Sequence, residues 1–171
     1  MDKLIYEEKV PINKTAFVAK VREISERLNI NPNWLMLLMN FETAGTMSHT
    51  IVNNIGATGL IQFMPNTAIG LGTTTAELRQ MTNVEQLEYV YKYLKPYKRH
   101  YNSLTDLYLA IFYPAALGKG ADYVITSDAV AKANPVFDLN KDLDISVKEI
   151  ETVINSRIPQ AWLNEFSKKK A

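Results

Sequence analysis

The sequence predicts an all-α fold, built as a single compact bundle of helices. Apolar residues recur at helical spacing through most of the chain, whereas the alternating pattern of a half-buried strand is nearly absent. Residues that favour helix starts and ends also stand where one periodic segment gives way to the next. Periodicity and helix punctuation together therefore indicate the fold class.

The first two helices have clear signals. The stripe expected to be buried in the first falls at i, i+4, i+7 and i+11: Phe17, Val21, Ile24 and Leu28. Asn13 or Thr15 is expected to cap this helix. A second helix should begin at Asn31-Pro32, because proline in the first turn loses no hydrogen bond. Its apolar run leads to Glu42, and residues 43–46 should end it.

The later helices are predicted from caps and breakers. Residues 48–58 are expected to form a loop, and Pro65 to start a short helix that Gly70 or Gly72 ends. Asn83-Val84-Glu85-Gln86 resembles a capping box, and Ser103 should cap a further helix. The stripes expected to be buried behind these caps are Leu87, Val90, Tyr91 and Leu94, then Leu104, Leu107, Tyr108 and Ile111.

Length and composition bound the classes of protein. With 171 residues, 47% of them hydrophobic and 22% charged, the chain can form one domain with a substantial core. We expect that domain over residues 1–134, with a helical extension over 135–171 packed on it. A net charge of +1 gives no broad attraction to nucleic acid. The longest apolar run, Leu35 to Met39, is too short for membrane insertion. No cysteine is present, so disulfides and thiolate chemistry are excluded.

Glu42 is the first candidate for chemistry. Counting back by four and by seven reaches Leu38 and Leu35, so its carboxyl group shares a stripe with apolar residues. A carboxylate there costs free energy unless it is paired or stays protonated, and a protonated carboxyl can act as a general acid. The alternative is a glutamate at the end of a helix whose side chain turns into solvent.

A second segment bears on that choice. Glu42-Thr43, followed by Gly59-Leu60-Ile61-Gln62-Phe63-Met64-Pro65, resembles the lysozyme-like lytic transglycosylases, which carry a Glu-Ser pair and a Gly-Leu-Met-Gln-x-Met-Pro signature. The resemblance covers roughly residues 15 to 127. It implies a lysozyme-like helical domain that acts on peptidoglycan glycan strands.

The resemblance also implies a mechanism with a single carboxyl. Glu42 would protonate the bond between N-acetylmuramic acid and N-acetylglucosamine and then accept the proton of the muramoyl 6-hydroxyl, leaving a 1,6-anhydromuramoyl end. No cofactor is needed. Gln62 becomes a substrate-binding group, and Thr43 and Phe63 are expected to line the same site. Most glycosidases add a second carboxylate about 5–9 Å away. The acidic residues expected instead on polar faces or caps are Glu77, Glu85, Glu88 and Asp106.

The family's third motif matches less closely. It is usually Ala-Tyr-Asn followed by small residues and glycine, whereas this chain has Tyr113-Pro114 and then Gly118. Tyr113 is expected to line the site, and Tyr123, in a segment similar to the family's Tyr-Val, is a further candidate. Residues 112–118 look more like phage-associated members than periplasmic ones. With an acidic N-terminus unlike a secretory signal, this suggests a virion-associated or released phage enzyme acting on the extracytoplasmic cell wall.

A calcium loop is predicted near the C-terminus. Residues 138–149 resemble an EF-hand loop, with Ile145 at the apolar position and Leu143 where glycine is normal. The oxygen ligands expected are Asp138, Asn140, Asp142, Asp144 and Glu149. Such an ion would be structural. The alternative is an acidic turn that caps a helix over 147–156.

Two alternatives to the transglycosylase remain open, and the sequence leaves the assembly open as well. A goose-type lysozyme-like hydrolase would use the same fold, and a silent glycan-binding module would lack activity. His49 and His100 are isolated and are expected at the surface. We expect a monomer or a domain of a larger assembly.

Overall fold

The computed structural model describes residues 3–125 and 128–168, and within these ranges the regular structure is helical, with only isolated β-bridges besides. The α-helices are α1 (Lys14–Leu28), α2 (Pro32–Glu42), α3 (Pro65–Gly70), α4 (Thr75–Gln80), α5 (Asn83–Leu94), α6 (Leu104–Phe112), α7 (Asp128–Ala133), α8 (Val147–Ser156) and α9 (Leu163–Phe166). Short 3₁₀ turns are η1 (Glu7–Lys9), η2 (Lys95–His100), η3 (Pro114–Ala116) and η4 (Gln160–Trp162). The predicted all-α class is confirmed.

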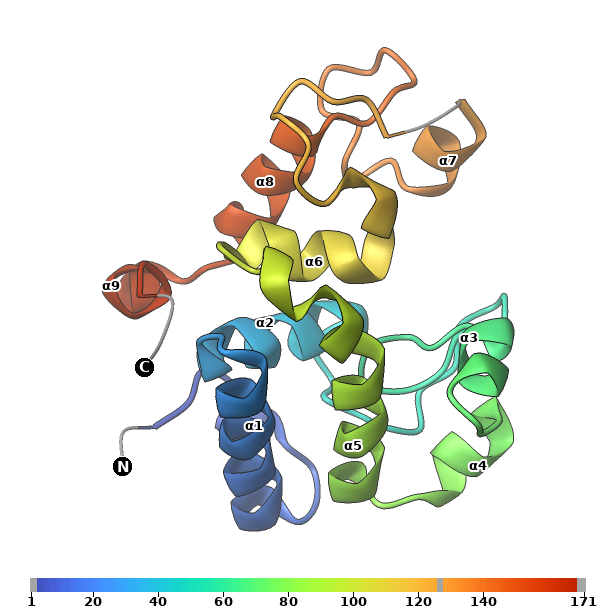
Figure 1. The fold of residues 1–171 in the computed structure, drawn as a ribbon, viewed down its shortest axis with the longest axis vertical. Coiled ribbons are helices and arrows are strands. Elements are labelled where there is room, and N and C mark those ends of the chain that lie inside the picture. The colour runs from blue at the N-terminus through green and yellow to red at the C-terminus, as the bar shows by residue number, and fades with distance from the viewer. Residues whose placement is uncertain (1–2, 126–127, 169–171) are drawn as a thin grey trace.

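The core is built around α2. All of its first eight residues, from Pro32 to Met39, are buried, as expected for a helix that is apolar on nearly every side. α1 packs on α2 and α5, and α6 packs on α2 and α5 as well, so α2 is covered on several sides (Figure 1). The stripe predicted for α1 is fully buried: Phe17, Val21, Ile24 and Leu28.

Segments from both ends of the chain are fastened to the first turn of α2. The Asn33 side chain accepts a hydrogen bond from the Ile5 N–H at 3.0 Å. The Asn31 side-chain amide donates to the Glu165 carbonyl at 2.6 Å, and the Trp34 indole donates to the Phe166 carbonyl at 3.1 Å. These bonds fix the position of the start of α2. They do not involve its last turn, which carries Glu42.

The caps agree with the sequence in part. Asn31 caps α2 and Pro32 follows it at the first helical position, as predicted. The capping box of α5 is formed by Thr82 and Glu85, one residue before the expected one. Asn13 precedes α1 with a left-handed φ of 52° and gives it no side-chain cap. Its side-chain amide donates to Asn83 at 3.2 Å.

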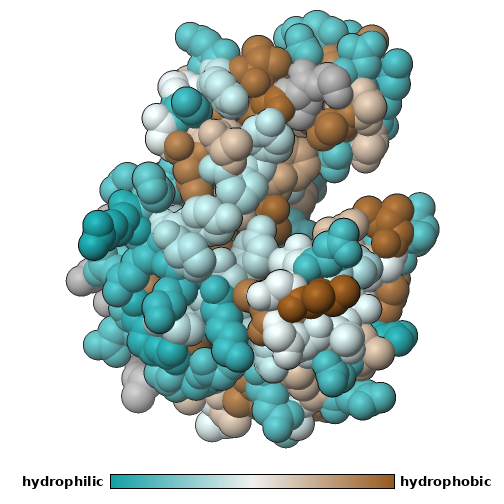
Figure 2. Space-filling view, turned by 45° about the vertical axis from the view of Figure 1, so that its right-hand side comes forward, coloured by the Kyte–Doolittle hydropathy of each residue, from teal (hydrophilic) through white to brown (hydrophobic). Residues whose placement is uncertain are grey.

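The segment after α6 returns to pack on that helix. α8 lies against α6, and an isolated bridge joins Val124 to Ser146. The space-filling view shows a notch in the surface between the part that carries α7 and the part that carries α3 (Figure 2). Figure 1 shows α2 running with its last turn towards that side of the molecule. None of the described helices is long and apolar enough to cross a membrane.

Candidate active site

Glu42 is the last residue of α2 and its carboxyl group is largely buried. The residue as a whole keeps some exposed surface, so the group lies at the wall of a site rather than deep in the core. Burial raises the pKa of Glu42 from 4.5 to about 7. Among the described residues, neither a hydrogen bond nor a nearby charge contributes to this shift. A substantial fraction of the carboxyl groups is therefore still protonated near pH 7, where an ordinary glutamate is ionised, and this fraction can donate a proton.

Two tyrosines are close enough to feel the charge of Glu42. Burial raises the pKa of Tyr93 to about 12, helped by Tyr97 and then by the Glu42 carboxylate. Burial and then Glu42 raise the pKa of Tyr108 as well. The phenols have no such effect on Glu42, because they are neutral at the pH where Glu42 titrates. The carboxyl group thus has aromatic neighbours from both α5 and α6.

Aromatic rings extend these two walls. The Tyr93 hydroxyl donates to the Ala110 carbonyl at 3.0 Å, which joins α5 to α6. On the other wall, Tyr108 stacks on Phe112 with ring centroids 5.8 Å apart and meets Phe41 edge-on at 5.6 Å. Such packing holds the rings of this wall in fixed positions.

The Gly-Leu-Ile-Gln-Phe motif forms a tight turn beside Tyr93. Backbone hydrogen bonds in both directions pair Thr58 with Phe63, at 3.0 and 2.8 Å. Gln62 lies in this turn with a left-handed φ of 52°, and its side-chain amide donates to the Gly59 carbonyl at 3.1 Å. Phe63 is buried and its ring meets Tyr93 edge-on at 6.3 Å. Tyr93 is thus a shared neighbour of Glu42 and the motif turn.

Thr43 supports the backbone and does not face the solvent. It is 0% exposed, its hydroxyl donates to the Met39 carbonyl at 2.7 Å, and it accepts the Met47 N–H at 2.9 Å. These bonds fasten the chain on both sides of Glu42. The side chain of Thr43 is therefore held inside the fold beside Glu42.

The two remaining candidate tyrosines, Tyr113 of the third motif and Tyr123 of the Tyr-Val segment, both follow α6 in the chain. Tyr113 is half-buried and follows α6 directly, so it stands at the same helix end as Phe112. Pro114 then begins η3, so the proline in place of the family's asparagine starts a new turn. Tyr123 is half-buried beside the Val124 bridge, with the Lys119 ammonium 5.6 Å from its ring centre.

The other acidic residues singled out from the sequence are engaged away from Glu42. The capping boxes of their helices use Glu77, Glu85 and Asp106, as expected from their positions. Glu88 pairs with Lys20 on α1. None of these four supplies a second carboxylate beside Glu42.

The predicted calcium loop adopts a turn stabilised by its own side chains. Leu143 takes a left-handed φ of 69°, the conformation for which an EF-hand normally uses glycine. Asp138 accepts the N–H groups of Asp142 and Leu143 at 3.1 and 3.2 Å. Glu149 forms a capping box with Ser146 at the start of α8. Within the described ranges no three His, Asp or Glu side chains are grouped to hold a metal ion.

One histidine differs from the sequence expectation. His49 is only 9% exposed, its Nδ1 is buried without a hydrogen-bond partner, and burial lowers its pKa. The expected surface position is therefore wrong for His49, although it is right for His100. The backbone carbonyl of His49 accepts a hydrogen bond from the buried side chain of Gln86 at 2.9 Å, which holds this segment inside.

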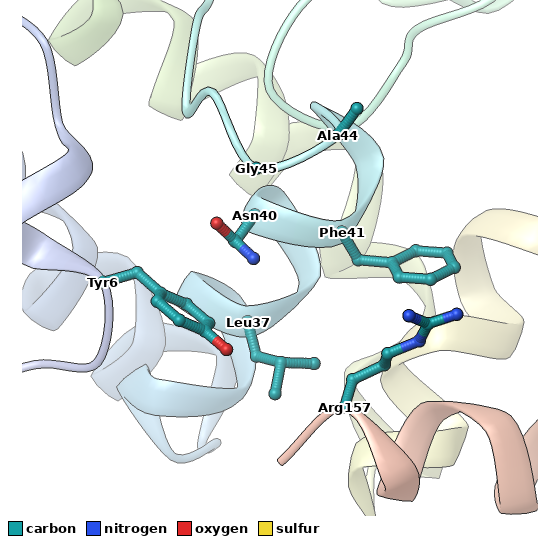
Figure 3. Close-up of a pocket in the computed structure, with 7 residues that line it drawn as sticks. All are labelled: Tyr6, Leu37, Asn40, Phe41, Ala44, Gly45 and Arg157. Carbon is teal, nitrogen blue, oxygen red and sulfur yellow. The ribbon is translucent and has the colours of Figure 1, made fainter. Parts of the chain in front are cut away.

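A separate cavity lies on the opposite face of α2. It measures about 350 Å³ and is lined by Tyr6, Leu37, Asn40, Phe41, Ala44, Gly45 and Arg157 (Figure 3). Because each helical residue advances by about 100°, Leu37 and Asn40 lie on the side of α2 away from Glu42, and Phe41 lies between the two sides. Figure 3 shows the Tyr6 hydroxyl and the Arg157 side chain directed towards this cavity.

Comparison with known proteins decides the family. The model of the family described as transglycosylase SLT domain matches residues 20–129. The chain belongs to the transglycosylase SLT family. The SLT domain is a lysozyme-like all-α fold whose members act on peptidoglycan, in agreement with the helical structure. No curated protein and no solved structure matches the chain.

The matched region contains the glutamate, the motif turn and both aromatic walls of this SLT domain. Glu42, Gln62 and Phe63 can be found from the sequence through the family's motifs. Tyr108 lies on a stripe that the sequence predicts to be buried, but no sequence pattern connects it to Glu42, and none points to Tyr93. Only the packing of α5 and α6 brings these tyrosines to the carboxyl group.

Proposed function

We propose that this SLT domain is a lytic transglycosylase that cleaves the β-1,4 bond between N-acetylmuramic acid and N-acetylglucosamine, with Glu42 as the single acid and base. The observation that carries the proposal is the lone, enclosed carboxyl group of Glu42, whose pKa burial raises to about 7. Membership of the SLT family supports the choice of substrate.

The chemistry needs only one proton carrier. The Glu42 carboxyl group gives its proton to the glycosidic oxygen as the bond to C1 of the muramoyl residue breaks, which releases the 4-hydroxyl of N-acetylglucosamine. The carboxylate then takes the proton of the muramoyl 6-hydroxyl as that oxygen bonds to C1. Glu42 is protonated again, and no water is consumed.

The neighbouring residues would divide the remaining work. Gln62 and Tyr113, both partly exposed, are proposed to contact the glycan. Thr43 and Phe63 are buried, so they would act through Glu42 and the motif turn. An enclosed, aromatic surrounding would keep the carboxyl group protonated until substrate arrives.

Product analysis tests the proposal directly. Purified peptidoglycan is digested with the wild-type protein, and the muramoyl ends are identified by mass spectrometry. Anhydro ends, lighter by one water than reducing ends, are expected. Reducing muramoyl ends would instead establish a goose-type lysozyme-like hydrolase, and an intact glycan that still binds the protein would establish a binding module.

The catalytic assignment has its own control. Glu42→Gln keeps the shape of the side chain but removes the proton donor, so it should abolish cleavage while the circular dichroism spectrum stays that of the wild type. A folded variant with near-normal turnover would refute the role of Glu42.

Delivery by a phage virion is a further part of the proposal. It is supported by the segment Phe112–Gly118, which resembles phage-associated members of the family. Mass spectrometry of purified virions from a phage that encodes the chain would detect the protein, and its absence from the virions would exclude this route.

A further inference from the structure

Gln86 is a buried amide on α5 whose hydrogen-bonding groups are satisfied by three separate segments. It is 0% exposed. Its Oε1 accepts the Leu60 N–H at 2.8 Å, and its Nε2 donates to the carbonyls of His49 and Leu78, both at 2.9 Å. The partners fix the orientation of the amide, because an N–H must face the oxygen and the two carbonyls must face the nitrogen.

These three partners are functionally distinct parts of the chain. His49 lies in the segment that leaves Glu42, Leu60 lies in the motif turn, and Leu78 lies in α4. A single side chain thereby ties the backbone that follows the glutamate to the turn that carries Gln62. It also accounts for the buried position of the His49 segment.

The motif turn is shaped around the Gln86 amide. Gly59 has a φ of +80°, and a Cβ added there would stand 2.3 Å from Gln86 Oε1, closer than two such atoms can approach. The Gln62 N–H and the Gln62 side chain both donate to the Gly59 carbonyl, each at 3.1 Å. Gln86 therefore sets the position of Gly59 and Leu60, and these set the position of Gln62.

α5 holds the turn at a second point as well. Tyr93, two turns after Gln86 on the same helix, meets the Phe63 ring and is a neighbour of Glu42. The helix therefore supports the turn by hydrogen bonds at one place and by ring packing at another.

We propose that Gln86 is a positioning residue that fixes the Gly59–Phe63 turn, and with it Gln62, relative to Glu42. This inference rests on the proposed glycan cleavage, in which Gln62 contacts the substrate. Gln86 itself would touch no substrate, because its side chain is fully buried.

Gln86→Glu tests the proposal by replacing one NH₂ group with oxygen. When protonated, the new carboxyl can accept the Leu60 N–H and donate to one of the two carbonyls. When ionised, it faces the carbonyls of His49 and Leu78 with no proton to give, which burial and carbonyl repulsion disfavour. The ratio of the variant's kcat/KM to that of the wild type at the same pH should be close to one near pH 5. Near pH 8 this ratio should be about tenfold lower.

Asn83→Asp is the matched control. Asn83 is also 0% exposed on α5, but its amide donates to the Ile12 carbonyl at 2.7 Å, on the side of the N-terminal segment. The same single-atom change should alter the stability of the fold, yet leave the ratio of kcat/KM to wild type flat across the pH range. A purely structural role for Gln86 would make the two variants behave alike.

Gln86→Met is the second variant, since it removes the hydrogen bonds of the amide at every pH. It should lower kcat/KM about tenfold at both pH values while the protein stays folded by circular dichroism. If both Gln86 variants fold and keep the kcat/KM of the wild type at both pH values, the proposal is overturned.

Hydrogen exchange separates this inference from the proposed function. The amide of Leu60 should exchange faster in Gln86→Met, which leaves it without its acceptor, and at the wild-type rate in Asn83→Asp. If wild-type protein cleaves no glycan, the function fails while this exchange result still decides whether Gln86 holds the turn. Unchanged Leu60 exchange in Gln86→Met would refute the positioning role.

Discussion

Replacing Glu42 should make the protein inactive and, at alkaline pH, more stable. Below about pH 4.5 the carboxyl group is protonated in both the folded and the unfolded chain, so it then contributes no pH-dependent difference. Between pH 4.5 and about 7 the unfolded chain releases this proton and the folded chain keeps it. The free energy of unfolding of the wild type therefore falls as pH rises through this range.

The size of the effect follows from the pKa. A rise from 4.5 to about 7 on folding corresponds to about 3 kcal/mol above neutrality, at about 1.4 kcal/mol for each tenfold change in proton affinity. The amide of Glu42→Gln does not ionise, so the variant escapes this loss. Its melting temperature should exceed that of the wild type by roughly 6–12 °C near pH 8.5, with the two converging near pH 4.

Denaturant unfolding of both proteins, at several pH values, measures this difference. Glu85→Gln is the matched control, because the hydrogen bonds from Thr82 lower the pKa of that exposed carboxyl and glutamine can keep the capping box. Its pH dependence should have the opposite sign, with the wild type favoured above the unfolded pKa and the difference lost as pH falls. A stability difference between wild type and Glu42→Gln that does not change with pH would refute the enclosed carboxyl.

Three further predictions concern activity and calcium. The cleavage rate should decline as pH rises through about 7, where Glu42 loses the proton it must donate; a rate that is flat into the alkaline range would contradict this. Gln62→Ala and Tyr113→Phe should each lower kcat/KM by less than Glu42→Gln lowers it, and two silent variants would place the glycan elsewhere. Calcium should raise the melting temperature of the wild type, and it should raise that of Glu149→Gln by a smaller amount. Glycan cleavage should continue in the presence of a chelator. Identical wild-type melting curves with calcium and with chelator would exclude calcium binding.

Most of the helices could be predicted from the sequence, because helix caps and buried stripes depend on residues close together in the chain. Asn31-Pro32 starts α2 and Ser103 caps α6 through bonds within a few residues, and the α1 stripe is buried as its spacing predicts. The α5 cap was misplaced by one residue because Thr82 and Asn83 are both good capping residues. Asn83 is instead buried against the carbonyl of Ile12, a contact 71 residues away along the chain.

Residues of the candidate site could be predicted from the sequence only where they belong to a sequence motif. Gln62 could be found because its neighbours recur in a family signature. Gln86, Tyr93 and His49 belong to no such pattern, and their burial depends on segments that meet only in the folded protein. The sequence pattern placed Gln86 in the expected capping box at the start of α5, and that pattern gives no indication of its three buried partners.

The fastening of α2 has a mechanical consequence. The bonds from Asn33 to Ile5 and from Trp34 to Phe166 both lie in the first turn of the helix, whereas Glu42 is its last residue. Tension applied between Ile5 and Phe166 would load that first turn and peel the two end segments from it. In a single-molecule pulling experiment, the earliest rupture should therefore spare the helix end at which bond cleavage is proposed to occur.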